Sequence, residues 1–198
     1  MKNLLCTLLP ALSLILTGTN SLQVAEDHTV ETMMTITDFT DRQDAIAWFI
    51  QNDSVMGGKS SGEFTVENEQ LTFTGFTNTD GGGFSSVQTR PLQLDLSKHE
   101  GIRLNVKADG RRYTWHIQTD AMWRGRRISY WADFDTGKGR WIIVDIPFSS
   151  FKPRSRGTLL DGPALDLTNI QELGLYIYDR QDGNFKLHLE SVAAYSSD

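Results

Sequence analysis

The most constraining feature of this 198-residue sequence is a series of short stretches in which apolar and polar residues alternate. From Phe64 onward, each stretch is stopped by glycine, proline, asparagine or aspartate before the next one begins. A period of two turns alternate side chains to opposite faces of a strand, so that one face is buried and the other is solvated. Ile102, Leu104 and Val106 show the pattern most clearly. The sequence therefore predicts an all-β domain of about eight or nine strands.

We expect these strands to form a two-sheet antiparallel β-sandwich of the jelly-roll kind, because that fold packs many short strands around one core. Asp109-Gly110 predicts a hairpin turn, and Asp182-Gly183 joins the last two strands. The apolar run at residues 142–144 indicates a strand that is central or buried on both faces. Residues 38–50 fit either a short helix or a turn that leads into a strand.

The N-terminus has the layout of a secretory signal peptide. Lys2 precedes an apolar run at residues 4–16, which is shorter than the roughly 20 residues of a membrane-spanning helix, and small or polar residues follow. We expect a signal peptide at residues 1–25 with cleavage near 21 or 25, a polar leader at 26–37 and a single domain at 38–195. The predicted signal peptide has a single lysine and none of the arginines of a mitochondrial presequence. We therefore predict an exported protein, either periplasmic or secreted.

Composition excludes several classes of protein. The sole cysteine, Cys6, lies in the predicted signal peptide, so the mature chain has no thiol for a disulfide scaffold, a thiol enzyme or a zinc-cysteine site. The net charge of −6 argues against a nucleic-acid partner. Residues 111–156 nevertheless carry ten Lys or Arg against four acidic residues. This basic stretch could form a partner-binding face, or its charges could pair with the acidic residues of the other sheet.

Residues 52–62 (NDSVMGGKSSG) contain two catalytic look-alikes. Gly58-Lys59-Ser60 ends like a phosphate-binding loop, but Asp53 stands where that motif needs its first glycine. Residues 58–62 also spell the nucleophile elbow of serine hydrolases, with Ser60 as the nucleophile. Both motifs require a helix after the loop, whereas residues 63–67 alternate like a strand. We therefore expect glycine turns here, with a hydrolase using Ser60 as a minor alternative.

No metal or cofactor site is predicted. The four histidines are far apart, and His116 and His188 fall at the polar phase of their strands, where exposure is expected. Asp133 and Asp135 leave structural calcium as an open alternative. Four tryptophans follow residue 110, and we expect three of them in the core and Trp123 to be exposed, where it could stack on a sugar ring.

Taken together, several motifs resemble those of the complex I intermediate-associated protein 30 family. They are residues 52–62, 81–86 (GGGFSS), 109–113 (DGRRY), 147–157 (PFSSFKPRSRG), 170–174 (IQELG) and 182–185 (DGNF), together with Trp48. The resemblance covers residues 38–195 and implies a sandwich similar to galactose-binding domains. It also implies a non-catalytic assembly factor, because mitochondrial members help intermediates of respiratory NADH:ubiquinone oxidoreductase to come together.

We therefore predict a non-catalytic binding or assembly-factor domain whose partner is a protein subunit of a respiratory or envelope complex. The alternative is an exported carbohydrate-binding module. The predicted binding residues are Trp123, Arg124, Arg126, Arg127, Arg154 and Arg156. The family-motif residues are expected to be mainly structural, with Met56 and Trp48 filling the core: Asn52, Asp53, Met56, Gly57, Gly58, Ser60, Gly62, Gly82, Gly83 and Phe84.

Overall fold

The computed structural model describes residues 31–40 and 46–197, in which the strands form two antiparallel sheets. The six-stranded sheet has the order β3 (Ser61–Glu67), β4 (Gln70–Thr77), β13 (Gly183–Ser197), β6 (Gly101–Ala108) and β9 (Trp141–Pro147), with β1 (Glu31–Thr37) also paired to β13. The seven-stranded sheet has the order β11 (Thr158–Leu159), β10 (Lys152–Ser155), β8 (Arg126–Asp135), β7 (Arg112–Trp123), β12 (Glu172–Ile177), β5 (Ser85–Thr89) and β2 (Trp48–Asn52). Two short 3-10 helices, η1 (Asp53–Met56) and η2 (Phe148–Ser150), lie in connections.

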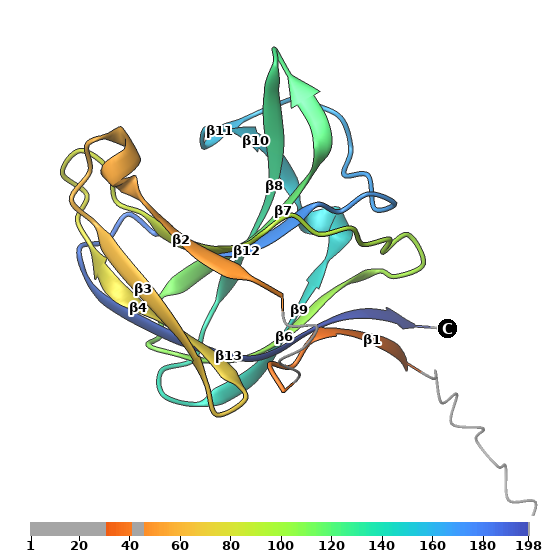
Figure 1. The fold of residues 1–198 in the computed structure, drawn as a ribbon, viewed down its shortest axis with the longest axis horizontal. Coiled ribbons are helices and arrows are strands. Elements are labelled where there is room, and N and C mark those ends of the chain that lie inside the picture. Colours follow the sequence, from red (N-terminus) through yellow and green to blue (C-terminus); the bar gives the residue numbers. More distant parts are fainter. Residues whose placement is uncertain (1–30, 41–45, 198) are drawn as a thin grey trace, which may run out of the picture.

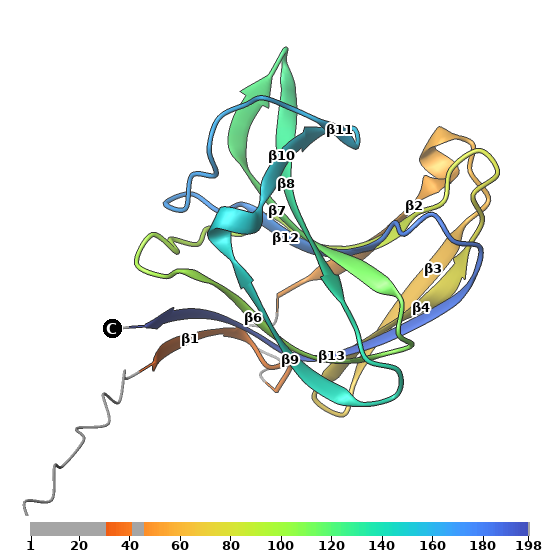
Figure 2. The same ribbon diagram turned by 180° about the vertical axis from the view of Figure 1, so that it is seen from behind.

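The two sheets pack face to face around one core, which confirms the predicted all-β sandwich (Figures 1 and 2). The alternation in the sequence builds this core, since the inward residues of β6 are fully buried and Arg103 and Asn105 between them are not. Each large apolar side chain buried in this way stabilises the fold by roughly 1.5–3 kcal/mol. The largest fully buried side chains are Trp115, Tyr113, Tyr130 and Phe73.

The structure corrects the predicted strand number and two turns. The described residues contain thirteen strands rather than eight or nine. The turn at Asp109-Gly110 does not close a hairpin, because β6 belongs to the six-stranded sheet and β7 to the seven-stranded one. The connection at residues 178–182 likewise crosses from β12 to β13 in the other sheet. Local turn chemistry predicts where the chain reverses, but pairing across the sandwich decides which sheet receives the next strand.

The prediction for residues 142–144 was wrong. They lie in β9, which is the edge strand beside β6, and Ile143 on its outer face is 65% exposed. Residues 38–50 were predicted to form either a short helix or a turn leading into a strand. Residues 48–52 form strand β2, so the second interpretation is correct for the end of that segment. β1 lies before the predicted domain start at residue 38, so the sheet includes residues that the sequence placed in the leader.

The predicted signal peptide at residues 1–25 lies outside the described residues. Within residues 31–40 and 46–197, no helix has the length and apolar character needed to cross a bilayer.

The seven-stranded sheet is curved, and this curvature positions the candidate sites. Figure 1 shows that the η1 connection at one end and the β7–β8 hairpin at the other both rise on the side away from the six-stranded sheet. We call this side of the seven-stranded sheet the outer face.

Candidate binding site

The glycine-rich loop at residues 52–62 is organised around a buried carboxylate. Asp53 is fully buried, and its Oδ1 accepts a hydrogen bond of 2.9 Å from the Ser60 amide. Its Oδ2 accepts bonds of 2.6 Å from the Gly83 amide and 3.3 Å from the Phe84 amide. Burial by itself would raise the pKa of this carboxyl, but the hydrogen bonds from Gly83, Ser60 and Phe84 outweigh it and lower the pKa. Asp53 therefore joins loop 52–62 to the loop at residues 78–84 as a charged anchor.

Two glycines make room for this anchor. A Cβ at Gly58 would lie 2.2 Å from the Asp53 carboxyl carbon, and one at Gly82 would lie 2.3 Å from its Oδ2. Gly57 has a φ of 86° and ends η1, whereas Gly58 and Gly62 do not have a positive φ. Met56 is 63% exposed, so the prediction that it fills the core was wrong. Met56 is the last residue of η1, which lies in a surface connection, so its side chain points away from the core.

The catalytic look-alikes in this loop are not supported by its surroundings. Ser60 is buried, its hydroxyl donates to the Asn78 carbonyl at 3.3 Å, and it accepts from the Asn78 amide at 3.0 Å. The loop leads into strand β3 rather than into a helix, so it builds neither a nucleophile elbow nor a helix N-terminus for phosphate.

The predicted binding residues lie around two neighbouring hairpin tips. β12 pairs with β7 only as far as Gln118, and β10 pairs with β8 only as far as Ser129, so the end of the β7–β8 hairpin pairs with no other strand (Figures 1 and 2). The β10–β11 hairpin lies beside it. We call this region the basic corner: Met122, Trp123, Arg124, Arg126, Arg127, Arg156 and Leu159.

The basic corner combines exposed apolar side chains with unpaired cations. Trp123 is 36% exposed as predicted, and the Arg124 guanidinium lies 5.5 Å from the centre of its ring. Within the described residues, the side chains of Arg126, Arg127 and Arg156 make no hydrogen bond or ion pair. The pKa of Glu172 is raised by burial, and the charge of Arg127 partly offsets that rise. Met122 and Leu159 are exposed at 54% and 59%.

Both hairpin tips hold an arginine in the left-handed region. Arg124 has a φ of 47° and is followed by Gly125 at 75°, while Arg156 at 49° is followed by Gly157 at 77°. Two successive residues with positive φ suit a tight hairpin, but the first position normally takes asparagine, aspartate or glycine. Arginine at both tips is therefore a local strain that internal packing does not explain.

The rest of the basic stretch serves the fold. Arg111 forms a two-point ion pair with Asp179, with contacts of 2.9 and 2.5 Å, and donates to the carbonyls of Gln181, Gly183 and Asn184. It thus holds the β12–β13 connection against β7. Arg112 pairs with Asp135. The predicted basic face therefore divides into structural pairs at one end and the basic corner at the other.

The outer face is a second candidate site that the sequence predictions missed. Strand registers place its side chains in three rows that cross the sheet. The central row is Lys152, Trp131, His116, Gly174, Gln88 and Phe49, and the flanking rows are Arg154, Ser129, Gln118 and Glu172, and Asp133, Thr114, Tyr176, Ser86 and Gln51. The missed signal was the presence of Trp131, His116 and Tyr176 at polar-phase positions, because ordinary solvated faces are poorer in aromatic side chains.

Aromatic rings meet at the middle of this face. Trp131 lies 5.1 Å from Tyr176 and 5.9 Å from Tyr178 between ring centres, and His116 meets the Tyr176 ring edge-on at 5.3 Å. The Arg154 guanidinium lies over Trp131 at 5.4 Å, so this predicted binding residue belongs to the outer face. A Cβ at Gly174 would come within 3.0 Å of Gln88 and 3.2 Å of His116, so glycine allows both side chains to close over it.

Several polar atoms on this face are buried without a partner. His116 is 1% exposed, which corrects the prediction of an exposed histidine, and neither of its ring nitrogens is hydrogen-bonded. Trp131 Nε1 and Arg154 Nε are unpartnered as well. Burial lowers the pKa of His116 to about 3, so the ring is neutral. Glu172 Oε1 lies 3.9 Å from His116 Nδ1, and burial raises the pKa of that carboxyl.

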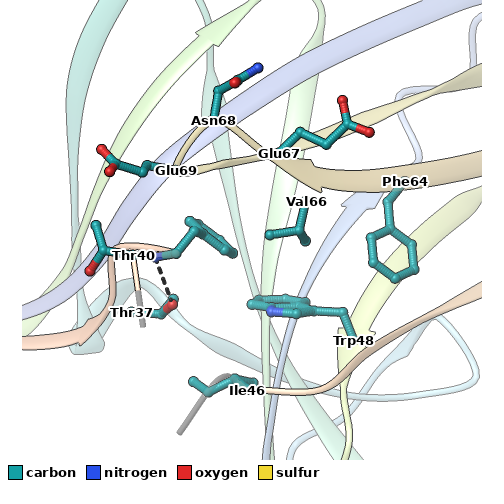
Figure 3. A pocket seen from close by; sticks show the side chains of 10 residues that line it. Thr37, Thr40, Ile46, Trp48, Phe64, Val66, Glu67, Asn68 and Glu69 are labelled. Carbon is teal, nitrogen blue, oxygen red and sulfur yellow. Dashed lines mark hydrogen bonds between the residues drawn. The ribbon is translucent and has the colours of Figure 1, made fainter. Parts of the chain in front are cut away.

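A cavity of about 590 Å³ is lined by residues from the end of β1, the start of β2 and the β3–β4 hairpin. Figure 3 shows these side chains. The wall of the cavity is mixed: five apolar residues, Phe39, Ile46, Trp48, Phe64 and Val66, are joined by Thr37, Thr40, Glu67, Asn68 and Glu69. None of the buried unpartnered polar atoms of the described residues lies among its lining residues. Trp48 packs against the core here, as predicted.

Among the residues that the structure describes, no group of three histidine, cysteine, aspartate or glutamate side chains is arranged to hold a metal ion. The two carboxylates considered for calcium have other partners, since Asp133 accepts from Thr114 and Asp135 pairs with Arg112. Of the tryptophans, Trp115 is in the core, Trp131 lies on the outer face and Trp141 is 43% exposed on β9, so the prediction of three core tryptophans was wrong.

The comparison with protein families decides the affiliation of the chain. Residues 37–189 match the family model described as Complex I intermediate-associated protein 30, and this span includes the Asp53 loop, the basic corner and most of the outer face. The chain belongs to the complex I intermediate-associated protein 30 family. The resemblance seen in the sequence motifs is thereby confirmed. The family and this kind of sandwich are typically non-catalytic.

Two relatives show how far the similarity to named proteins extends. The chain is 30% identical over 164 residues to an uncharacterized protein of Schizosaccharomyces pombe, covering 72% of this chain and 75% of the relative. It is 26% identical over 180 residues to the mitochondrial complex I intermediate-associated protein 30 of Mus musculus, covering 80% of this chain and 55% of the relative. The chain thus spans about half the length of the mouse protein.

Among solved structures, the family domain is similar to a family 11 carbohydrate-binding module of Clostridium thermocellum in complex with a β-1,3-1,4-mixed-linked tetrasaccharide. The TM-score is 0.59 at 20% sequence identity, over 83% of this chain and 94% of the module. At this identity the likeness concerns the fold alone. In this member of the complex I intermediate-associated protein 30 family, the Asp53 loop is architectural, whereas the basic corner and the outer face present groups that the fold itself does not use.

Proposed function

We propose that the protein is an exported, non-catalytic assembly factor that docks on a protein subunit of a respiratory or envelope complex through the basic corner. Family membership supports the assembly role, since the mouse relative is named for its association with complex I intermediates. The observation that carries the proposal is the pair of neighbouring Arg-Gly tips with left-handed arginines beside exposed Trp123. Backbone strain that no internal contact explains is concentrated at binding sites.

The composition of the corner fits a protein partner. Tryptophan and arginine are the residues that contribute most often to the centres of protein interfaces, and apolar neighbours exclude water from them. The cations without partners favour an acidic surface on the docking subunit, and their attraction would weaken as salt rises.

Charge reversal tests this proposal. The variant R124E/R126E/R127E and a matched variant, K98E/K107E/K186E, change the net charge equally. The matched variant alters two cations of the six-stranded sheet, in β6 and β13, and one in the β5–β6 connection. Each full-length protein is used to recover partners from cross-linked membranes of its source organism, followed by mass spectrometry. We expect the corner variant to recover respiratory or envelope subunits at least tenfold less well than the matched variant. Equal recovery by the two variants contradicts docking at the corner, and recovery of no such subunit by the wild type contradicts the assembly role.

Export has its own test. Mass measurement of the protein purified from its source would show a mature chain that starts after residue 21 or 25. An intact leader on protein located inside the cell would contradict it.

A further inference from the structure

We propose that the outer face of the seven-stranded sheet binds an uncharged oligosaccharide, with Trp131 and Tyr178 as its ring contacts. This site is separate from the basic corner and goes beyond the proposed docking function.

The first argument is the set of buried polar atoms without partners. Buried polar groups in proteins are nearly always hydrogen-bonded, and each exception calls for a water, an ion or a ligand. Within the described residues, six buried side-chain nitrogens lack a partner, and four of them lie on the outer face: both nitrogens of His116, Nε1 of Trp131 and Nε of Arg154. They come from the neighbouring strands β7, β8 and β10, so they lie together in one part of the sheet.

The second argument is the combination of rings and polar groups. Tyr178 is 36% exposed and meets Trp131 edge-on, so the two present apolar surface at the margin of the face. The C–H side of a sugar ring packs on such aromatic surface, and its hydroxyls both donate and accept hydrogen bonds. Beside these rings, the Gln88 amide nitrogen donates to the Ser86 and Tyr176 hydroxyls at 2.8 Å each, which holds those two hydroxyls in position on the face. Neutral His116 and the Glu172 carboxyl add groups that suit hydroxyl partners.

The third argument concerns charge and backbone. Lys152 and Arg154 on this face are matched by Asp133 and Glu172, so the face does not favour an anionic ligand over a neutral one. A peptide that binds by strand addition needs the free backbone of an edge strand. Over the three rows of the outer face, the backbone groups of β7, β8 and β12 are engaged with neighbouring strands on both sides, so this face offers side chains alone.

Calorimetry and tryptophan fluorescence with defined sugars test the site in the full-length protein. The probes are the β-1,3-1,4-mixed-linked glucose tetrasaccharide, cellotetraose, maltotetraose and chitotetraose at millimolar concentration, with tetragalacturonate as a charged comparator. We expect at least one neutral probe to bind more tightly than tetragalacturonate. We expect W131A to weaken that binding at least tenfold and Y178A severalfold, while W123A and W141A leave it unchanged.

Tyr178 is already exposed, so Y178A decides the result if W131A does not fold. Binding of none of the neutral probes, tighter binding of tetragalacturonate, or a loss caused by W123A and not by Y178A would overturn the proposal. The double variant R124E/R126E separates the two sites, because it should lose partner recovery and keep its affinity for sugar, whereas Arg127 is left in place because its charge acts on Glu172 of the outer face. Failure of one function therefore leaves the other measurable.

Discussion

The Asp53 loop and the outer face both bury polar groups, but they treat them in opposite ways. The Asp53 carboxylate accepts hydrogen bonds from three backbone amides, and Gly58 and Gly82 leave the space that a Cβ would take from it. His116 is equally buried, yet neither ring nitrogen has a partner. A satisfied buried group stabilises the fold, whereas an unsatisfied one lowers stability unless something outside the chain completes it. The contrast separates an architectural motif from a candidate binding face.

The largest expected effect is that of D53A. Removing the carboxylate leaves the amides of Ser60, Gly83 and Phe84 buried without an acceptor. We expect the free energy of unfolding to fall by about 3–5 kcal/mol, as measured by urea denaturation. D80A removes an exposed carboxylate of the same loop pair and should change it by less than about 1 kcal/mol.

Acid pH should reveal the same anchor. The pKa of Asp53 is lower in the folded protein than in the unfolded chain, where it is near 4. The contribution of the ionised carboxylate to the free energy of unfolding is therefore complete above pH 4 and is lost as the pH falls through the folded pKa. Acid titration below pH 4 should therefore destabilise the wild type more than D53N. Parallel acid profiles for the two proteins would argue against an ionised Asp53.

A slightly smaller effect is expected for G82A. The new Cβ would overlap the Asp53 carboxylate, so the anchor and the loop at residues 78–84 cannot both keep their positions. We expect destabilisation of about 1–3 kcal/mol by thermal or urea unfolding. G162A, where a Cβ meets its nearest neighbour at 3.4 Å, should be close to neutral. Equal stability of the two variants would show that the glycines of the motif serve another purpose.

The variant H116L should have little effect on stability at pH 7, because it removes no hydrogen bond; we expect a change of less than about 1.5 kcal/mol. Its effect lies in the pH profile. The pKa of His116 is about 3 when folded and near 6.5 when unfolded, so the unfolded chain takes up a proton first and stability falls as pH drops below 6.5. The wild type should lose about 1.4 kcal/mol per pH unit between pH 6 and 4 from this residue.

Denaturation of both proteins at several pH values checks this prediction. Glu172, Trp131 and Tyr176 face the His116 ring, and Glu172 is the acidic group among them. The double variant H116L/E172Q is the control for the part of the pH dependence that comes from Glu172. A wild-type profile as steep as that of H116L would contradict a neutral buried histidine.

The smallest effect is expected for R124G. Glycine accepts the left-handed conformation without strain, so stability should stay the same or rise by less than about 1 kcal/mol. Partner recovery should nevertheless fall. An arginine kept for the fold would behave in the opposite way, with lower stability and unchanged recovery.

The alternation of residues such as Ile102, Leu104 and Val106 was sufficient to predict the sandwich. The chain reversal at Asp109-Gly110 was placed correctly, but it does not close the predicted hairpin. The loop motif also predicted a mainly structural role for Asp53 and Ser60, and both side chains accept hydrogen bonds from loop amides. These features are local or periodic, so neighbouring residues determine them. The exposed Trp123 beside arginines could be predicted for the same reason.

Tertiary pairing alone decided the rest. His116 stands at a polar-phase position as predicted, yet it is buried because Trp131 and Tyr176 from neighbouring strands close around it. Residues 142–144 read as a central strand, yet β9 has only one neighbour in its sheet. The sequence by itself determined the all-β sandwich and the inward faces of its most regular strands. Which strands became neighbours, and hence which polar groups were left without partners, was decided by contacts between segments far apart in the chain, which no local pattern encodes.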